Sequence, residues 1–243
     1  MQVLGKTDIG KVRDNNEDNF AAETMNDIAF SVVCDGMGGT EGGEIASEIA
    51  VDTILSQVTN SYSVKMKDTA VERMLISALT AANMKIYDYS VNNNLQGMGT
   101  TVVAAILRNS SLIIAYAGDS RAYIVSDEKI EQITTDHTYL QELYRMEKIT
   151  KEQMQTDPRK NIITRALGVA DALEIDTIQK DINDKDIVLL CSDGLTNCLS
   201  DEAILEICKT QPFEKISDVL IDKANENGGT DNVTVTVIRN TEE

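Results

Sequence analysis

Four aspartates occupy similar places in the sequence. Asp35 and Asp193 each follow a short apolar segment and precede a glycine, and Asp231 lies between a Gly-Gly turn and the last apolar segment. Asp119 lies in the turn Gly118-Asp119-Ser120-Arg121. One aspartate in a turn means little, but four at the ends of predicted strands favour carboxylates that converge on one edge of the sheets. Clustered carboxylates repel one another unless cations neutralise them, so this convergence implies bound metal.

The first of these aspartates opens the stretch Asp35-Gly36-Met37-Gly38-Gly39. Glycine lets the backbone adopt positive φ and lets other groups approach it closely. A carboxylate and bare backbone carbonyls are hard oxygen donors, which Mg²⁺ and Mn²⁺ prefer. The alternative for this stretch alone is a glycine turn whose aspartate caps the following helix.

Ligands that are all oxygens disfavour zinc, and they suit a pair of Mg²⁺ or Mn²⁺ ions. Two such ions about 3.5–4 Å apart can share a water and generate hydroxide near neutral pH, which suits attack on phosphorus without a protein nucleophile. A phosphate ligand is available in Arg13, because a guanidinium can hold phosphoryl oxygens through two hydrogen bonds. Its segment, residues 13–19, is otherwise typical of a solvated loop, which is the alternative interpretation.

Three competing motifs fail on residue type or spacing. The stretch 5–12 has the glycines and lysine of a phosphate-binding loop, but Val12 stands where the Mg²⁺-binding Ser or Thr must be. Residues 35–39 lack oxygen donors at the third and fifth positions of an EF-hand loop. No Gly-x-Ser-x-Gly sequence is present, and His137, the one histidine, makes a serine triad improbable. We interpret His137 as a structural or flap residue, with a general-acid role as the alternative.

The apolar pattern predicts a chain rich in β-strands. Short runs of β-branched and aromatic residues predict strands over 28–34, 100–107, 111–117, 122–126, 130–133, 187–192 and 233–238. The four strands between residues 100 and 133 are joined by connections of hairpin length, so an antiparallel meander is expected.

Helical spacing of apolar residues predicts helices over 41–58, 68–89, 202–208 and 213–226. Residues 136–168 are polar and mostly helical in pattern, and they include a candidate capping box at Thr150-Lys151-Glu152-Gln153. A polar excursion between strands is a candidate flap over a site. Because no repeat or linker divides the chain, residues 1–243 are expected to form a single domain with a flap subdomain at about 136–168.

Composition limits the partners and the compartment. The chain has 40 acidic and 22 basic residues, a formal charge of −18, and 42% hydrophobic residues. So acidic a protein repels phosphate backbones and anionic lipids, which argues against nucleic-acid and membrane binding. No signal peptide and no apolar run of about 20 residues is visible. The four cysteines lack Cys-x-x-Cys spacing, so reduced thiols in a cytoplasmic protein are expected.

The ordered set of motifs resembles the metal-dependent type 2C serine/threonine protein phosphatases in their compact bacterial form. Each motif alone is weak, but together they extend through the whole chain in the family's order. They are Arg13…Asn16-Glu17-Asp18, Asp35-Gly36-Met37-Gly38-Gly39, Gly99-Thr100-Thr101, Gly118-Asp119-Ser120-Arg121, Asn161…Thr164-Arg165-Ala166-Leu167-Gly168, Ser192-Asp193-Gly194-Leu195 and Asp231-Asn232-Val233-Thr234.

The resemblance implies an α+β fold, a four-layer αββα sandwich of two antiparallel β-sheets flanked by helices. It implies that Asp35, Asp193 and Asp231 bind the first metal ion, and that Asp35 and the Gly36 carbonyl bind the second. By the same resemblance, Glu17 and Asp18 match acidic residues that hold metal-bound water or the second metal ion. Asp119 and Asp193 match the ligands of a third, weaker metal ion. Arg13 matches the phosphate-binding arginine.

The implied activity is hydrolysis of phosphoserine and phosphothreonine esters in bacterial signalling. A monomer acting on the substrates of a serine/threonine kinase is expected. The alternatives are a binuclear phosphodiesterase and a catalytically silent binding module on the same fold. Two positions depart from the family pattern. Met37 replaces a histidine proposed as general acid in many eukaryotic members, and Asp157-Pro158 replaces a His-Pro pair common in the flap of bacterial relatives.

Overall fold

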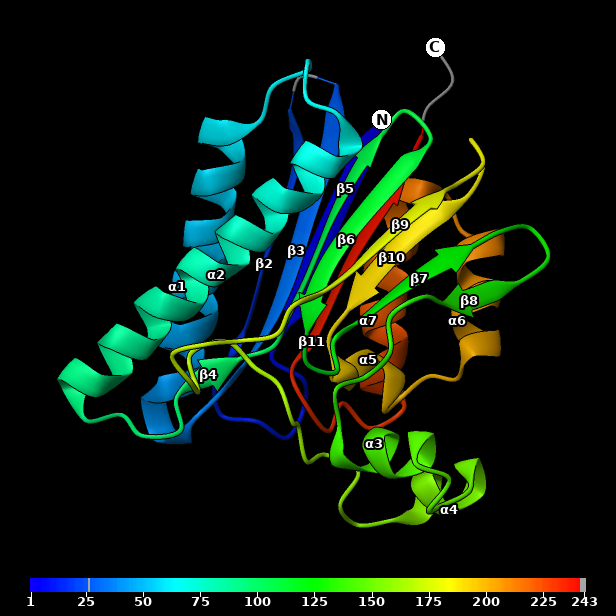
Figure 1. Cartoon of the computed structure of the whole chain (residues 1–243). Helices are drawn as coiled ribbons and strands as arrows, with labels where there is room; N and C mark the ends of the chain where they lie inside the picture. The colour runs from blue at the N-terminus through cyan, green and yellow to red at the C-terminus, as the bar shows by residue number, and fades with distance from the viewer. Residues whose placement is uncertain (26, 241–243) are drawn as a thin grey trace.

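The computed structural model describes residues 1–25 and 27–240, which form two antiparallel β-sheets (Figure 1). One sheet has the strand order β1-β11-β10-β7-β8, and the other β2-β3-β5-β6-β9 with the short β4 paired to β3. The strands are β1 Gln2–Asp8, β2 Asp18–Met25, β3 Ile28–Met37, β4 Gly99–Thr100, β5 Val102–Arg108, β6 Ser111–Ala117, β7 Arg121–Val125, β8 Ile130–Gln132, β9 Asp176–Asp181, β10 Ile187–Cys191 and β11 Val233–Arg239.

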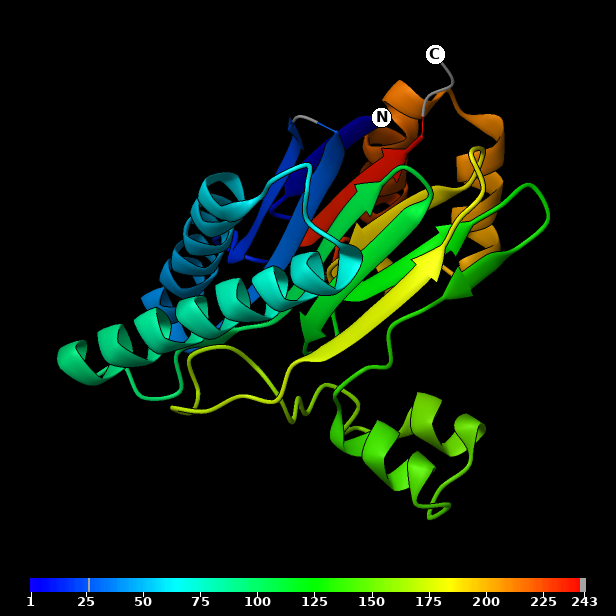
Figure 2. The same ribbon diagram turned by 45° about the horizontal axis from the view of Figure 1, so that its top comes forward.

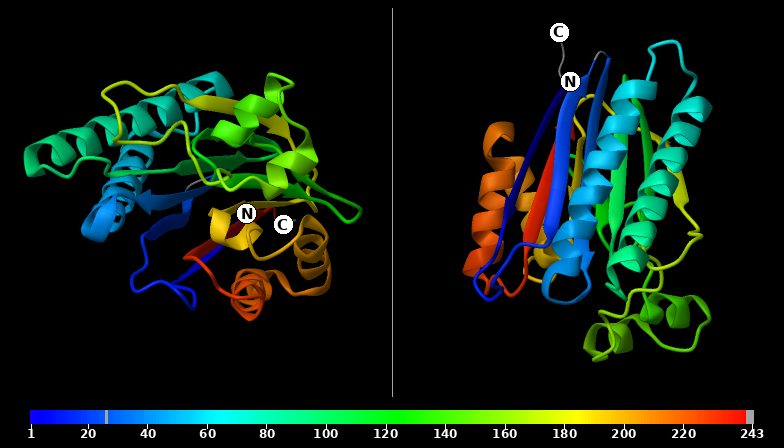
Figure 3. Two further views of the ribbon diagram at one scale, coloured as in Figure 1. Left: turned by 90° about the horizontal axis from the view of Figure 1, so that it is seen from below. Right: turned by 90° about the vertical axis from the view of Figure 1, so that its left-hand side faces the viewer.

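Helices cover the outer face of each sheet, which gives four layers in the order αββα. The long helices α1 Gly39–Ser61 and α2 Asp68–Asn93 lie on one side. The helices α5 Asp193–Thr196, α6 Asp201–Thr210 and α7 Ile216–Glu226 lie on the other, with the 3-10 turn η1 Phe213–Lys215 before α7. Figure 3 shows the two groups on opposite sides of the sheets. The predicted α+β sandwich is confirmed.

The alternation of side chains along β3 explains this layering. Its even-numbered residues from Ile28 to Cys34 belong to the core under α1 and α2. Ala29 and Val33 point the other way, into the apolar layer shared by the two sheets. Side chains two apart in a strand share a face, so Asp35 lies at the end of this layer between the sheets. A carboxylate there faces the strand ends of the opposite sheet.

Several predicted elements are confirmed and several boundaries change. The strands predicted at 111–117, 187–192 and 233–238 correspond to β6, β10 and β11, and the four predicted helices are present with longer or divided ranges. The predicted strand 28–34 continues through Asp35 and Gly36, so these residues lie within β3 and not after it. The predicted strand 100–107 is divided at Thr101 into β4 and β5.

The predicted meander is wrong at residues 118–120. β6 pairs with β5 and β9, whereas β7 pairs with β10 and β8 in the other sheet. A short connection is compatible with a hairpin or with a crossing between packed sheets about 10 Å apart, because each residue spans about 3.3 Å. The structure adopts the crossing. This brings Asp119 to the space between the sheets.

Three strands were not predicted, namely β1, β2 and β9. Each lies at the edge of its sheet and carries many polar, partly exposed residues. Edge strands have water on one side, so the apolar pattern that marks buried strands is weak in them.

The polar excursion between β8 and β9 contains α3 Tyr139–Arg145 and α4 Lys151–Thr156, which lie beyond the ends of the sheets (Figure 2). The predicted capping box is present, because Thr150 and Gln153 each bond the other's backbone N–H. We call residues 138–163, the middle of the predicted flap subdomain at about 136–168, the flap. No helix in the described part of the chain is long and apolar enough to cross a membrane.

A buried hydroxyl pair joins the two sheets. Ser31 Oγ on β3 donates to Thr236 Oγ1 on β11 at 2.7 Å, and both residues are fully buried. We expect Ser31→Ala to lower the free energy of unfolding by about 1–2 kcal/mol, since it leaves the Thr236 hydroxyl without this partner. Urea unfolding measures the change, and the exposed Ser56→Ala on α1 is the matched control. Equal stability of the two variants would contradict this prediction.

Candidate metal centre

Asp18 and Asp35 lie opposite each other in neighbouring strands, since the register of β2 and β3 pairs them directly. Directly paired residues of an antiparallel ladder point to the same face, so both carboxylates face the space between the sheets. Ser192, at the end of β10 in the other sheet, donates from Oγ to Asp18 Oδ2 at 2.7 Å. This contact joins the two sheets where the acidic residues gather.

The backbone of Asp35 is held by two threonines. Its N–H donates to Thr101 Oγ1 at 3.0 Å, and its carbonyl accepts from Thr101 N–H and from Thr100 Oγ1, each at 2.9 Å. Thr101 Oγ1 also lies 2.6 Å from Ser120 Oγ, next to Asp119 in the turn that crosses between the sheets. The motif Gly99-Thr100-Thr101 therefore fixes Asp35 and connects it to the Asp119 turn.

Gly36 lies where α1 approaches β3 most closely. A Cβ built on Gly36 would lie 2.1 Å from the Gly43 carbonyl oxygen and 2.6 Å from the Glu17 carbonyl oxygen. Gly36 N–H donates to that Glu17 oxygen at 3.1 Å. Only glycine allows this close approach. The contact keeps Glu17 and Asp18 beside the end of β3.

The opposite sheet supplies Asp193 and Asp231. Asp193 is the first residue of α5 and accepts a hydrogen bond from Asn197 Nδ2 at 2.9 Å. Asp231 lies just before β11, and its Oδ2 accepts from Arg13 Nη2 at 2.8 Å. The Arg13 side chain is half exposed. In this arrangement Arg13 is paired to a proposed metal ligand and is reachable from solvent.

The loop that carries Arg13 and Glu17 is fixed by asparagines. Asn232 Oδ1 accepts from Glu17 N–H at 2.9 Å, and Asn232 Nδ2 donates to the carbonyls of Ile9 and Asn15. Asn16 bonds the Asp18 N–H through its own Oδ1. Residues 13–17 do form a loop, and its first three residues are exposed, as the solvated-loop interpretation expects. Asp18 departs from it, because this residue is buried at the start of β2. Local polarity could not show the contact with Asn232, which is more than 200 positions away.

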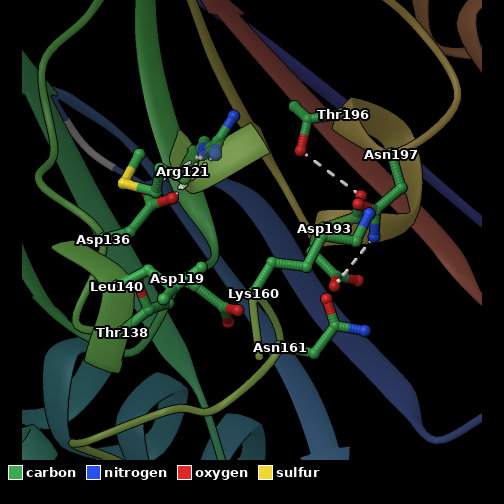
Figure 4. A pocket seen from close by; sticks show the side chains of 11 residues that line it. Asp119, Arg121, Asp136, Thr138, Leu140, Lys160, Asn161, Asp193, Thr196 and Asn197 are labelled. Atoms are coloured by element: carbon green, nitrogen blue, oxygen red, sulfur yellow. Dashed lines mark hydrogen bonds and ion pairs between the residues drawn. The ribbon is translucent and has the colours of Figure 1, made fainter. Parts of the chain in front are cut away.

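Asp119 lines a cavity of about 230 Å³ between the sandwich and the flap. Figure 4 shows Asp119 and Asp193 on the sandwich side, with Lys160 and Asn161 of the flap between and below them. Asp119 is 7% exposed, and its Oδ1 has no hydrogen-bond partner among the described residues. A buried carboxylate oxygen without a donor is costly unless a cation or water satisfies it.

The acidic residues affect one another's ionisation. Burial, followed by the charges of Asp18, Asp193, Asp119 and Asp231, raises the pKa of Asp35 well above its usual value. Burial also raises the pKa of Asp18 to about 7, despite its bond from a serine, and that of Asp119 to about 7. For Asp193, burial and then the charge of Asp231 raise the pKa. The carboxylates of the two sheets therefore lie within electrostatic range of one another.

These residues fit a divalent metal centre in their chemistry. Within residues 1–25 and 27–240, no three acidic, histidine or cysteine side chains already converge closely enough to enclose an ion. The carboxylates do lie near enough to destabilise one another's charge, and among the described residues no donor reaches one buried oxygen each of Asp18 and Asp119. All donors are oxygens, which suits Mg²⁺ or Mn²⁺.

Glu17 is also part of this neighbourhood, since burial raises the pKa of its carboxyl group. A Cβ on Gly43 would lie 2.7 Å from Glu17 Cδ, so the start of α1 holds this side chain closely. The structure thus places Arg13, Glu17, Asp18 and the four other aspartates at one end of the sandwich.

The two departures from the family pattern have structural settings. Met37 lines a largely apolar cavity of about 290 Å³ with residues such as Ile163 and Val169. Asp157 accepts hydrogen bonds from the backbone N–H and the guanidinium of Arg159. Asp157 therefore closes a turn of the flap, which is a local structural role.

Supporting hydroxyl and amide groups were not predicted as part of the site. Thr101, Ser192 and Asn232 contact residues of the site through long-range hydrogen bonds. Ser120 contacts Thr101 and directly follows Asp119. Each falls inside a motif that carries the family resemblance, which was the available signal. Which partner each would meet could not be predicted from local sequence.

The fold and the acidic site define a class, the metal-dependent phosphoprotein phosphatases. The family model described as Protein phosphatase 2C matches residues 4–233. The serine/threonine phosphatase stp of Listeria monocytogenes serotype 4b (strain F2365) is 40% identical over 241 residues, 98% of this chain and 95% of that protein. The chain therefore belongs to the Protein phosphatase 2C family, and it is a serine/threonine protein phosphatase.

Solved structures agree with this assignment. The serine/threonine phosphatase of S. agalactiae has a TM-score of 0.92 at 31% identity, covering 99% of each chain. The catalytic domain of the phosphatase PstP, solved in complex with 2 manganese ions, has a TM-score of 0.84 at 33% identity. That match covers 97% of this chain and 96% of the other.

The raised pKa values predict how the stability of the metal-free protein depends on pH. A carboxyl group whose folded pKa exceeds its unfolded value of about 4 stabilises the fold at low pH, and this contribution is lost as pH rises through the folded pKa. Because the pKa values of Asp18 and Asp119 are raised to about 7, the melting temperature of the protein in EDTA should fall between pH 5 and pH 8. His137 opposes this trend, because burial lowers its pKa, but it is one group against several.

Thermal unfolding followed by circular dichroism measures this dependence. Mn²⁺ should reduce this fall in melting temperature, since the bound cation replaces protons as the charge that neutralises the carboxylates. Asp119→Asn should also reduce it, because the amide carries no charge to bury. A melting temperature in EDTA that rises from pH 5 to pH 8 would contradict the prediction.

Proposed function

We propose that the protein hydrolyses phosphoserine and phosphothreonine monoesters by attack of a water activated between two divalent metal ions. The observation that carries the proposal is the gathering of aspartates from both sheets at one end of the sandwich, where burial and mutual repulsion raise the pKa of Asp35, Asp18, Asp119 and Asp193. The manganese ions bound to the PstP catalytic domain support the same assignment.

The proposed ligands come from four segments of the chain. Asp35, Asp193 and Asp231 would hold the first ion, and Asp35 with the Gly36 carbonyl would hold the second, so that Asp35 bridges. Glu17 and Asp18 would hold the surrounding water or support the second ion. When bound, the pair of ions supplies a nucleophilic water at neutral pH and positive charge for the phosphoryl oxygens.

The chain's own contributions are binding and orientation. Thr100 and Thr101 fix the backbone of Asp35, so its carboxylate is positioned before substrate arrives. Arg13 is exposed enough to reach a phosphate, and its planar guanidinium can bind two of the phosphoryl oxygens. Its pairing with Asp231 would be exchanged for the phosphate, which carries more negative charge. Met37 has no titratable group, so it cannot donate a proton to the leaving group.

We further propose a third, weaker ion at Asp119 and Asp193. Both side chains line the same cavity, and Asp119 Oδ1 is buried without a partner among the described residues. The cavity lies beside the flap, whose Lys160 and Asn161 also line it.

The wider setting of the enzyme is part of this proposal. We propose one domain over residues 1–243, with a flap subdomain at about 136–168, acting as a cytoplasmic monomer on proteins phosphorylated by a serine/threonine kinase. The net charge of −18 supports protein substrates over nucleic acids and anionic membranes. The four free cysteines are compatible with a reducing compartment.

Removal of a core ligand tests the two-metal assignment. We expect Asp35→Ala and Asp231→Ala to lower kcat/KM for p-nitrophenyl phosphate and for a phosphothreonine peptide by more than about 100-fold with Mn²⁺ present. The reason is that even outer partners of metal ligands are commonly worth about 10- to 100-fold. Asp52→Ala, on an exposed position of α1, is the control and should keep full activity.

The same assays separate the alternatives. Full activity of Asp35→Ala or Asp231→Ala would refute the ligand assignment, and no phosphate release by the unaltered protein would support a silent binding module. Faster cleavage of bis(p-nitrophenyl) phosphate than of the monoester would favour a phosphodiesterase.

A separate substitution tests the third ion. Asp119→Ala should lower turnover while two Mn²⁺ ions still bind, because Asp35, Asp193 and Asp231 remain in place. Isothermal titration calorimetry with Mn²⁺ counts the binding events in the variant and in the unaltered protein. Loss of all metal binding in Asp119→Ala would contradict the assignment of a distinct third site.

A further inference from the structure

His137, the chain's single histidine, lies at the base of the flap. It is 6% exposed, and its carbonyl accepts from Thr164 N–H at 2.8 Å. Two residues further into the flap on each side, Tyr139 N–H donates to Ile162 O at 2.8 Å. The two ends of the flap therefore meet at His137.

His137 and Gly118 are joined by two hydrogen bonds. The backbone N–H of His137 donates to Gly118 O at 2.9 Å, and Gly118 N–H donates to His137 Nδ1 at 3.2 Å. An Nδ1 that accepts carries no proton, so Nε2 carries it and donates to Asp176 Oδ2 at 3.3 Å. Gly118 directly precedes Asp119 in the turn between the sheets, so His137 holds the residue next to a proposed metal ligand.

The other side of this turn is equally constrained. Gly118 has a φ of 115°, and a Cβ on it would lie 2.6 Å from Thr101 Cβ. Ser120, on the far side of Asp119, is held by the contact of its Oγ with Thr101 Oγ1 at 2.6 Å. Asp119 Oδ1 has no partner of its own in the described part of the chain. The backbone of the turn, held between Thr101 and His137, therefore sets the direction of the Asp119 carboxylate.

We propose that His137 is a positioning residue for Asp119. By accepting the Gly118 N–H at Nδ1 it fixes the turn, and through the turn it sets the affinity of the third metal ion. This inference rests on the third ion of the proposed function. It assigns to His137 neither contact with substrate nor transfer of a proton.

A role limited to packing makes a different prediction. The ring of His137 stacks on Tyr116 with centroids 5.1 Å apart, so its volume also matters. The side-chain amide of asparagine lies about as far from the backbone as Nδ1 of histidine. The amide of glutamine extends about as far as Nε2. The amide oxygen of either residue can accept a hydrogen bond. Positioning through Nδ1 predicts that His137→Asn retains function better than His137→Gln. Packing alone predicts the reverse, because glutamine is closer to histidine in size.

The test is Mn²⁺ titration calorimetry on the full chain and on both variants. We expect the third ion to bind about 10-fold more weakly to His137→Gln, as is usual when a partner that orients a metal ligand is lost. In His137→Asn its affinity should stay within about twofold of the unaltered protein. The affinities of the two tighter ions should be unchanged in both. A third ion that binds equally well to all three proteins, or more weakly to His137→Asn than to His137→Gln, would overturn the proposal.

A second measurement follows the turn directly. In the Mg²⁺-loaded protein, hydrogen exchange of the Gly118 amide measured by NMR should be slow in the unaltered chain and in His137→Asn, and faster in His137→Gln. Equal exchange rates in the three proteins would overturn the role of Nδ1. If His137→Gln does not fold, His137→Asn alone still decides, since about 10-fold weaker binding of the third ion there contradicts the proposal.

The calorimetry also distinguishes this inference from the proposed function on which it rests. Only two binding events in the unaltered protein would remove the third ion, and with it the inference. Three events that are equally tight in every variant would remove only the role assigned to His137.

Discussion

The gathering of buried and partly buried carboxylates at one end of the sandwich is the constraint on which the rest of this structure depends. Asp35 lies at the end of the layer between two sheets, where burial and then the charges of Asp18, Asp193, Asp119 and Asp231 raise its pKa. These charges also repel one another. In water such charges would separate. Here strands and turns hold them together, so the stability of this end of the sandwich is coupled to the positive charge bound there.

The rest of the molecule supplies rigidity against that repulsion. The apolar layers bury both sheets, and Ser31 and Thr236 join them through hydroxyl groups in the core. Closer to the site, Thr101 contacts both the backbone of Asp35 and the hydroxyl of Ser120. Carboxylates that repel one another can keep their positions because the backbone beneath them is hydrogen-bonded in several directions.

The flap is attached at the same place. Its two ends meet at His137, whose ring and backbone both bond Gly118 beside Asp119. The cavity that Asp119 and Asp193 line is also lined by Lys160 and Asn161 of the flap. The flap, the Asp119 turn and the end of β3 thus form one continuous hydrogen-bonded unit. Substrate access and metal binding share this framework in the proposed function.

The sequence by itself determined the chemistry of the candidate site. Asp35 and Asp193 could be selected because an aspartate after an apolar run and before glycine is a local pattern, and Asp231 because it lies between a Gly-Gly turn and the last apolar run. Oxygen ligands alone favour Mg²⁺ or Mn²⁺. The inner strands and main helices were predictable for the same reason, since buried β-branched runs and helical spacing are visible within a few residues.

Only the tertiary structure decided how these parts meet. Local pattern could not show that the connection of residues 118–120 crosses between sheets, that edge strands β1, β2 and β9 exist, or that Asp18 lies opposite Asp35. Nor could it assign partners such as Asn232 to Glu17 or Ser192 to Asp18, which lie more than 170 positions apart. These contacts arise from the packing of the two sheets, and packing depends on residues far apart in the chain.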